Sequence, residues 1–236
     1  MRAIVVFKAI TRNWLRSRSG LFLSLLFPVI FILLFGSSSS QADYYLPGLI
    51  TAAIMVTGII GLTNNVIEFK STGLTKRLSA TPLTKLEWIL GNILSQTVFA
   101  VALAAVMMIL GIGLYRTPVT INLYMVLILL AGVTLSSGIG ITLAGLVRDP
   151  EVASGLGYAI AFPMTFVSGT FWSVSTMPDF FQAAARVLPL TYFSEGLRDS
   201  MLGGDAHAAL LNLGATVAFA AAFIAIGVKV THWRED

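Results

Sequence analysis

Residues 88–115 read WILGNILSQTVFAVALAAVMMILGIGLY, an apolar run without any Asp, Glu, Lys, Arg or His. A helix needs about 20 such residues to cross the hydrocarbon core of a bilayer. The whole chain has the same character, because 56% of its 236 residues are hydrophobic and only 11% are charged. Soluble domains carry about 25% charged residues. We therefore predict an all-α integral membrane protein, with one transmembrane domain over residues 1–236.

Five further stretches have the length of a spanning helix or come near it. The first is short and is followed by Gly36 and the serine run 37–40, which indicate a loop. An even number of spans places both ends of the chain on the same side of the membrane. The sequence predicts six transmembrane helices, over residues 21–35, 45–65, 88–115, 121–147, 152–172 and 206–230.

The distribution of Lys and Arg predicts the orientation. They gather in residues 1–20 and in the loop 66–87, whereas the segments on the other side hold only Arg116, Arg186 and Arg198. Cytoplasmic loops carry the excess of basic residues in membrane proteins. We expect a multi-pass protein of the cytoplasmic membrane with both termini in the cytoplasm. The same rule accounts for the net charge of +4, so nucleic-acid binding is not expected.

The segment 1–19 is patterned as an amphipathic helix. Lys8, Arg12 and Arg16 recur every fourth residue on one face, and apolar residues occupy the opposite face. Such a helix lies in the headgroup plane with its basic edge towards anionic lipid. The alternative is a cleaved signal peptide, made of this basic segment and the apolar run after it. The patterned basic face favours the interfacial helix.

Two long connections carry structure of their own. In the cytoplasmic loop 66–87, Gly73 and the Thr81-Pro82 pair bound a short predicted helix. The external loop 173–205 is too apolar to be free. A capping box from Thr176 to Asp179 predicts the start of a first helix there.

A second external helix is predicted over residues 192–202, with Glu195, Arg198 and Asp199 on its wetter side. Gly203 and Gly204 end it. We expect both external helices to dip into the outer leaflet and return.

The chain offers little chemistry of its own. It has no cysteine and only two histidines, so neither a thiolate site nor a zinc site is expected. No phosphate-binding loop and no catalytic motif are present. No ionisable residue lies at the middle of a predicted span, where ion-driven transporters usually place one. We predict no catalytic residue, no metal and no cofactor in this chain, which leaves the energy source to be supplied from outside.

Three features inside the spans remain. Ser136, Gly140 and Ala144 form a stripe of small residues, typical of closely packed helices; a substrate surface is the alternative. Pro163 predicts a kink that serves either packing or a hinge. Asn64 and its neighbour Asn65 are expected to form interhelical hydrogen bonds or to line a polar cavity.

The loop after the second span reads EFKSTGLTKRLSATPLTKLEWILG over residues 68–91. Its order of an acid, a glycine, a basic-leucine pair, a Thr-Pro and a further glycine resembles the ABC-2 family of ATP-binding-cassette export permeases. A second stretch is similar to the same family, with Ser168-Gly169, Met177-Pro178, Leu188-Pro189-Leu190-Thr191-Tyr192 and Leu197-Arg198 in order. The family often has proline where Trp172 or Ser173 stands, so this sequence departs from the family pattern at the entry to the external helices.

The resemblance implies a permease without a motor. A separate ATPase subunit would bind ATP and Mg²⁺, and two permease chains, identical or related, would pair in the lipid bilayer. The cargo implied is a hydrophobic or amphipathic drug, antibiotic or lipid-like molecule, as in multidrug resistance.

The resemblance also implies two sets of site residues. The lysines and arginines among them would meet acidic rims of the ATPase, although retention of the loop in the cytoplasm explains them equally. The ATPase-coupling set is Glu68, Lys70, Gly73, Lys76, Arg77, Leu78, Thr81, Pro82, Leu83 and Lys85. The external re-entrant set is Met177, Pro178, Pro189, Thr191, Tyr192 and Arg198.

Two rival functions stay open at this point. An ion-coupled secondary transporter or channel requires a buried ionisable group and no ATPase partner. A membrane-embedded enzyme requires a polar catalytic cluster at one depth, which the scarcity of histidine and cysteine disfavours.

Overall fold

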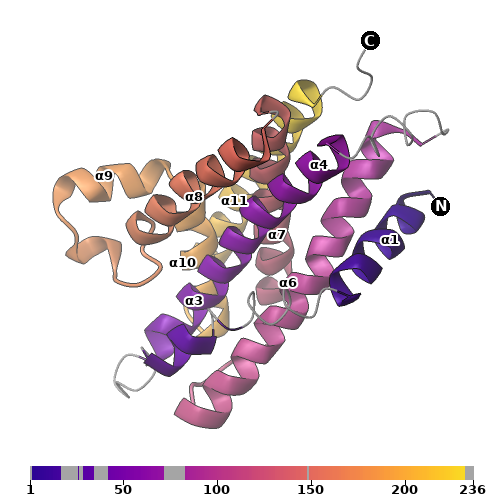
Figure 1. Ribbon diagram of the computed structural model, residues 1–236. Helices are drawn as coiled ribbons and strands as arrows, with labels where there is room; N and C mark the ends of the chain where they lie inside the picture. The colour runs from indigo at the N-terminus through magenta and orange to yellow at the C-terminus, as the bar shows by residue number, and fades with distance from the viewer. Residues whose placement is uncertain are drawn as a thin grey trace.

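The computed structural model describes residues 2–16, 26, 29–34, 42–71, 83–147 and 149–231. These residues form helices and connecting turns, with no strand among them. The helices form one bundle, with α1 beside α6 and with α9 at its edge, next to α8 and α10 (Figure 1). The elements are α1 (Arg2–Arg16), α3 (Ala42–Val56), the π turn η1 (Thr57–Gly61), α4 (Leu62–Ser71), α6 (Lys85–Tyr115), α7 (Leu123–Leu146), α8 (Pro150–Val167), the 3₁₀ turn η2 (Val174–Thr176), α9 (Asp179–Val187), α10 (Pro189–Met201) and α11 (Ala206–Val230).

The predicted all-α class is confirmed. Within the described ranges, four helical stretches are long and apolar enough to cross a membrane, namely Asp43–Phe69, Lys85–Tyr115, Leu123–Leu146 and Ala206–Val230. The apolar helix Glu151–Val167 is shorter. Most of the expected first span, 21–35, falls outside the description, so the six-span layout stays a prediction.

Local side-chain chemistry determines where several helices begin. A capping box starts α6, because the Glu87 amide donates to the Thr84 hydroxyl at 3.2 Å and the Thr84 amide donates to the Glu87 carboxylate at 3.0 Å. The capping box expected from Thr176 is wrong. The Thr176 hydroxyl donates instead to the Ser173 carbonyl within η2, and Pro178 caps α9 without a side-chain bond.

The second external helix starts three residues earlier and ends one residue earlier than expected. It begins at Pro189, three residues before the predicted start, because proline fits the first position of a helix, where its missing amide is not needed. The two glycines end the helix as expected. Gly203 takes a positive φ of 71° and the Gly204 amide donates to the Asp199 carbonyl at 2.8 Å.

The stripe of small residues on α7 packs against the π turn. A Cβ on Gly58 would lie 2.2 Å from the Ser136 hydroxyl, and one on Gly140 would lie 3.0 Å from the carbonyls of Gly58 and Ile59. The Thr63 hydroxyl bridges the two helices by donating to the Gly140 carbonyl at 3.1 Å. The interpretation of this stripe as a packing surface is therefore confirmed.

The other side of α7 packs on α11 at similarly short distances. A Cβ on Gly138 would lie 3.1 Å from the backbone nitrogen of Ile224, and one on Gly145 would lie 3.0 Å from the Val230 side chain. The Thr142 hydroxyl donates to the Phe223 carbonyl at 2.9 Å. These contacts make α7 and α11 a closely joined pair.

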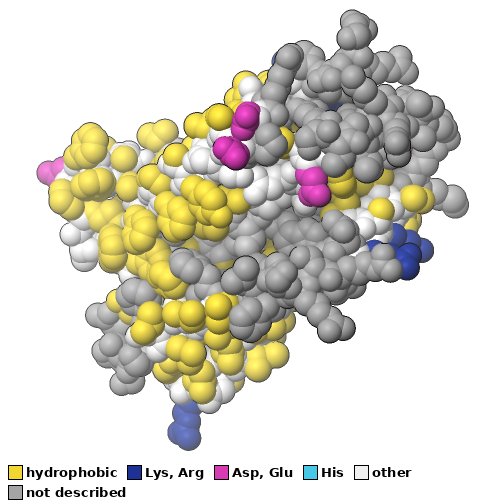
Figure 2. Space-filling view, in the orientation of Figure 1, with side chains coloured by type: hydrophobic (Ala, Val, Ile, Leu, Met, Phe, Trp, Pro, Cys, Tyr) yellow, Lys and Arg dark blue, Asp and Glu magenta, His cyan; other side chains and the backbone are white. Residues whose placement is uncertain are grey.

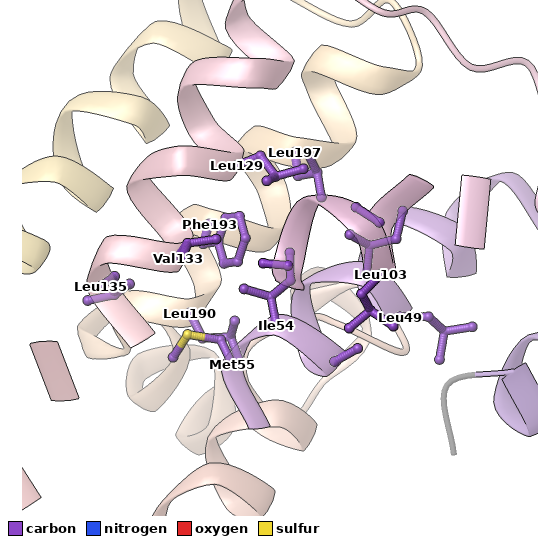
Figure 3. Close-up of a cluster of buried hydrophobic side chains, with 14 of the residues drawn as sticks. Leu49, Ile54, Met55, Leu103, Leu129, Val133, Leu135, Leu190, Phe193 and Leu197 are labelled. Carbon is purple, nitrogen blue, oxygen red and sulfur yellow. The ribbon is translucent and has the colours of Figure 1, made fainter. Parts of the chain in front are cut away.

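The larger hydrophobic cluster lies where α3, α6, α7 and α10 meet (Figure 3). Phe193 of α10 is fully buried, and Figure 3 shows its ring beside Val133 of α7. Gly132 makes room for that ring, since a Cβ there would lie 2.2 Å from it. α10 is therefore held in the bundle through its apolar face.

The surface of the described residues suits a lipid solvent. Figure 2 shows hydrophobic side chains over α3, α8 and α9, with Lys and Arg side chains over α1 and beyond the Tyr115 end of α6.

One interhelical hydrogen bond expected of the asparagines is present, from the Ser154 hydroxyl to the Asn64 amide oxygen at 2.8 Å.

The contact between the π turn and α7 can be tested by a size swap. Gly58→Ala should destabilise the protein by about 1–3 kcal/mol, because the added carbon overlaps Ser136. Adding Ser136→Gly should restore part of the loss. Thermal unfolding in detergent checks both, with Gly113→Ala, at a site with no neighbour within 4 Å, as the control. A double variant no more stable than Gly58→Ala would contradict the contact.

Candidate functional site

The Lys85 end of the bundle is where α4 and α11 finish and α6 and α8 begin. A second hydrophobic cluster joins these helix ends, through residues that include Trp88 of α6, Ala153 of α8 and the partly buried Val228 of α11. α1 contributes Ile10 to the same cluster. A displacement at this end therefore acts on several helices at once.

α1 lies on α6 through its apolar face. Ile10 is buried, and the Ser95 hydroxyl of α6 donates to the Phe7 carbonyl at 3.2 Å. Lys8 and Arg12 are exposed on the other face. A helix is therefore present in this segment, at Arg2–Arg16, with its apolar face on protein, and its placement in the headgroup plane stays a prediction.

Four residues of the predicted coupling set fall within the description. Glu68 is exposed near the end of α4, Lys70 belongs to the same helix, and Leu83 packs against the second hydrophobic cluster. The Lys85 ammonium donates to the backbone carbonyl of Val228 in α11. The remaining residues lie outside the described ranges, namely Gly73, Lys76, Arg77, Leu78, Thr81 and Pro82.

At the opposite end, five residues form what we call the Arg198 cluster: Tyr44, Gly169, Glu195, Arg198 and Asp199. The Arg198 guanidinium carbon lies 3.8 Å from the centre of the Tyr44 ring, a cation–π contact. One guanidinium nitrogen donates to the Gly169 carbonyl at 3.0 Å, and the Tyr44 hydroxyl donates to the same oxygen at 2.8 Å. The cluster joins α3, α10 and the turn after α8.

The backbone of that turn is held equally closely. Gly169 has a φ of +76°, which favours glycine. A Cβ on Gly48 of α3 would lie 1.9 Å from the Thr170 carbonyl oxygen, so that only glycine allows the turn to touch the helix. The Ser194 hydroxyl of α10 completes the contact by donating to the Ser168 carbonyl at 3.0 Å.

Burial dominates the electrostatics of the Arg198 cluster. It lowers the pKa of Arg198, which Tyr44 and the acids partly offset. Burial raises the pKa of the Glu195 carboxyl more than the nearby Arg198 charge lowers it. The pKa of Asp199 is raised for the same reason, against Arg198 and a hydrogen bond from Asn212. The expectation that these three residues face water is wrong for Arg198, whose guanidinium turns inward onto Tyr44.

The other residues of the external set hold α9 to α10. The Thr191 hydroxyl donates to the Ala185 carbonyl and the Tyr192 hydroxyl to the Arg186 carbonyl, each at 2.6 Å. Pro189 starts α10, Pro178 is the residue before α9, and Met177 is buried with its carbonyl bound to the Gln182 amide at 2.9 Å. The set thus shapes a folded-back helix pair.

Sequence reasoning missed three contacts. The pattern Thr84-x-x-Glu87 before an apolar run is itself a capping signal that could have been found. Tyr44 gave no signal, because a tyrosine at a helix end usually indicates a membrane interface. Trp88, at the start of a predicted span where tryptophan usually indicates a membrane interface, is 2% exposed and packs in the same cluster as Val6 and Ile10 of α1.

The described residues offer no metal centre, since no group of three or more His, Cys, Asp or Glu side chains comes together among them. The described contacts hold the helices together at both ends of the bundle.

The sequence of this chain matches a known protein family and several named relatives. A family model described as ABC-2 type transporter matches residues 3–202. The chain is 28% identical over 200 residues, 82% of its length, to "Linearmycin resistance permease protein LnrN" of Bacillus subtilis. It is 25% identical over 72% of its length to "ABC transporter G family member 20" of Dictyostelium discoideum. It is 23% identical over 86% of its length to "Probable multidrug ABC transporter permease YbhS" of Escherichia coli.

The matched relatives are longer than this chain. The match covers 50% of the Bacillus protein, 54% of the Escherichia protein and 24% of the Dictyostelium protein. The chain thus spans about half the length of the two bacterial relatives.

A double-mutant cycle tests the cation–π contact of the Arg198 cluster. Tyr44→Leu and Arg198→Met should each lower the unfolding free energy, and the double variant should lose less than the sum, by about 1 kcal/mol. Thermal or denaturant unfolding of the purified protein measures all four variants. Strictly additive losses would show that the two side chains do not interact.

The raised pKa of Glu195 predicts that Glu195→Gln increases the thermal stability of the protein in a pH-dependent way. The folded protein binds a proton at the Glu195 carboxyl more tightly than the unfolded chain does. The protonated carboxyl therefore favours folding below the ordinary pKa of 4.5. This contribution to the stability is lost as the pH rises through the pKa of Glu195 in the folded protein. The variant should therefore melt at a higher temperature than the wild type at pH 7.5 and at the same temperature at pH 4. A lower melting temperature at pH 7.5 would mean that the carboxylate is stabilised by Arg198.

Proposed function

The chain belongs to the ABC-2 type transporter family, and on that premise we propose that it is the membrane-spanning permease subunit of an ATP-driven exporter. Members of this family are transmembrane subunits, so ATP and Mg²⁺ would bind to a separate ATPase subunit. The cargo would be a hydrophobic or amphipathic molecule, such as a drug, an antibiotic or a lipid-like compound, carried out across the cytoplasmic membrane.

One observation carries the proposal. The loop 72–82 leaves α4 and enters α6 at the Lys85 end, where both flanks pack into the second hydrophobic cluster together with α1 and α11. A partner that pushes on this loop would move these helices together. The exposed Lys8 and Arg12 of α1 lie on the same helix that contacts α6, so α1 would flank the partner.

The coupling residues would divide the work of binding the ATPase. Lys76 and Arg77 would meet acidic groups, and Leu78 would enter an apolar hollow. Leu83 is a weaker candidate for direct contact, because it already packs against the chain's own cluster.

The names of two relatives support the proposed cargo class. They are named for linearmycin resistance and for multidrug transport. The outward face of α8 is aromatic, with Tyr158, Phe162 and Phe166 exposed and the rings of Tyr158 and Phe162 stacked at 5.9 Å. Such a face suits an apolar cargo or a second permease chain, identical or related.

The topology proposed for the chain has six spans within a single domain over residues 1–236, both termini in the cytoplasm, and α9 and α10 at the outer leaflet. The Lys85 end would face the cytoplasm, in keeping with the positive charge of the loop 66–87. Exposed Phe180 and Phe181 on α9 suit contact with lipid.

Coexpression with an ABC ATPase subunit tests the function. The wild-type chain should copurify with the ATPase in lipid and support cargo-stimulated ATP hydrolysis. Leu78→Asp should weaken the complex by about 2 kcal/mol or more, because a carboxylate cannot enter an apolar hollow. Affinity capture and hydrolysis rates measure this.

The control is Ile121→Asp, an equal change at an exposed position at the other end of α6. It should leave ATPase capture intact. If no ATPase binds the wild-type chain, or if Leu78→Asp changes nothing, the exporter proposal fails and ion-driven transport through a buried ionisable group becomes the better account.

A further inference from the structure

Lys85 is the first residue of α6, immediately after the loop, yet its ammonium reaches a different helix. It donates to the backbone carbonyl of Val228, in the last turn of α11. These two residues are 143 positions apart in the chain. No motif in the sequence indicates this contact, because one partner is a backbone atom.

The end of α11 has a physical need for such a donor. The last four carbonyls of a helix lack amide partners within it, and the Thr231 amide supplies one only for Gly227. The partial negative charge of a helix C-terminus also favours a cation. Lys85 meets both needs for α11, although a cation at the first turn of its own helix α6 is unfavourable.

Neighbouring contacts fix both helices that the Lys85–Val228 hydrogen bond joins, α6 and α11. The capping box of Thr84 and Glu87 fixes the start of α6, and Leu83 and Val228 pack against the same hydrophobic cluster. On the far side, α11 is joined to α7 by the Thr142 hydrogen bond and by the glycine contacts described above. A displacement of residue 85 is therefore passed to two further helices.

We propose that Lys85 is a positioning residue that joins the loop 72–82 to α11 and, through it, to α7. This inference rests on the proposed exporter function and adds a second route to the one through α6. Motion imposed on the loop by the ATPase turns α6 directly and carries α11 along through the Lys85–Val228 bond. Lys85 thereby acts within the chain, in place of the contact with the ATPase expected from the family resemblance.

Lys229 provides the matched comparison. It is a lysine in the same last turn of α11, next to Val228, and its side chain is exposed. Lys229→Met removes one positive charge from the Lys85 end of the bundle, as Lys85→Met does, but it leaves the hydrogen bond from Lys85 to Val228 in place. A mere requirement for positive charge predicts the same outcome for both lysines, whereas the positioning role predicts an effect at Lys85 alone.

The first experiment measures the joint itself and needs no ATPase. The chain has no native cysteine, so spin labels can be placed on Leu86→Cys of α6 and Ile226→Cys of α11, both exposed positions. Lys85→Met should broaden the distance distribution between the labels, Lys85→Arg should restore the narrow one, and Lys229→Met should match the wild type. An unchanged distribution in Lys85→Met would overturn the proposal. Should that variant not fold, Lys85→Gln takes its place with the same two outcomes.

The second experiment measures coupling in the complex with the ATPase, reconstituted in lipid vesicles. Lys85→Met should lower the cargo exported per ATP hydrolysed about fivefold or more, with recovery in Lys85→Arg and no change in Lys229→Met. Loss of capture would instead make Lys85 a direct contact and overturn the proposal. Failure to find any ATPase would overturn the exporter function, yet the label distances would still decide the role of Lys85 in joining α6 to α11.

Discussion

Every backbone amide and carbonyl in this apolar chain must find a partner within the protein, since lipid offers none. Within a helix, the amides and carbonyls bond to one another. At helix ends and at irregular turns, some of these groups lack a partner. The structure places polar side chains at those points. The hydroxyls of Thr57 and Thr63 bond to carbonyls around the π turn, and the Lys85 ammonium bonds to a carbonyl at the end of α11.

Small residues turn these satisfied helices into a bundle. With little polar surface to bury, close backbone approach provides the attraction between helices. α7 shows this on two sides, with Gly140 against the π turn and Gly138 against α11. The Arg198 cluster follows the same principle, because Gly48 allows the turn after α8 to touch α3 before the arginine and tyrosine add their contacts.

Composition and periodicity were sufficient to predict the helical membrane class, the amphipathic first helix and the packing role of Gly140. They succeeded because each of these depends on the average character of a segment. Contacts between segments were harder to predict. The bond from Lys85 to Val228 has a carbonyl as its acceptor, and any residue carries one. Arg198 was placed in water because helical periodicity cannot indicate that a tyrosine near residue 44 will meet it. The Thr176 capping box failed because the hydroxyl had a nearer acceptor in Ser173.

The π turn at Thr57–Gly61 has a consequence for how this chain can vary. A π turn is an α-helix with one residue inserted, so it shifts the faces of α4 by roughly 100° relative to those of α3. Ile59 belongs to the larger hydrophobic cluster and Leu62 to the smaller one, which makes the turn the boundary between two registers. A substitution at one position leaves both registers in place. The loss of one residue within the turn would instead rotate all of α4 and take Asn64 away from Ser154, so that insertions and deletions are far less tolerated here than in the loops.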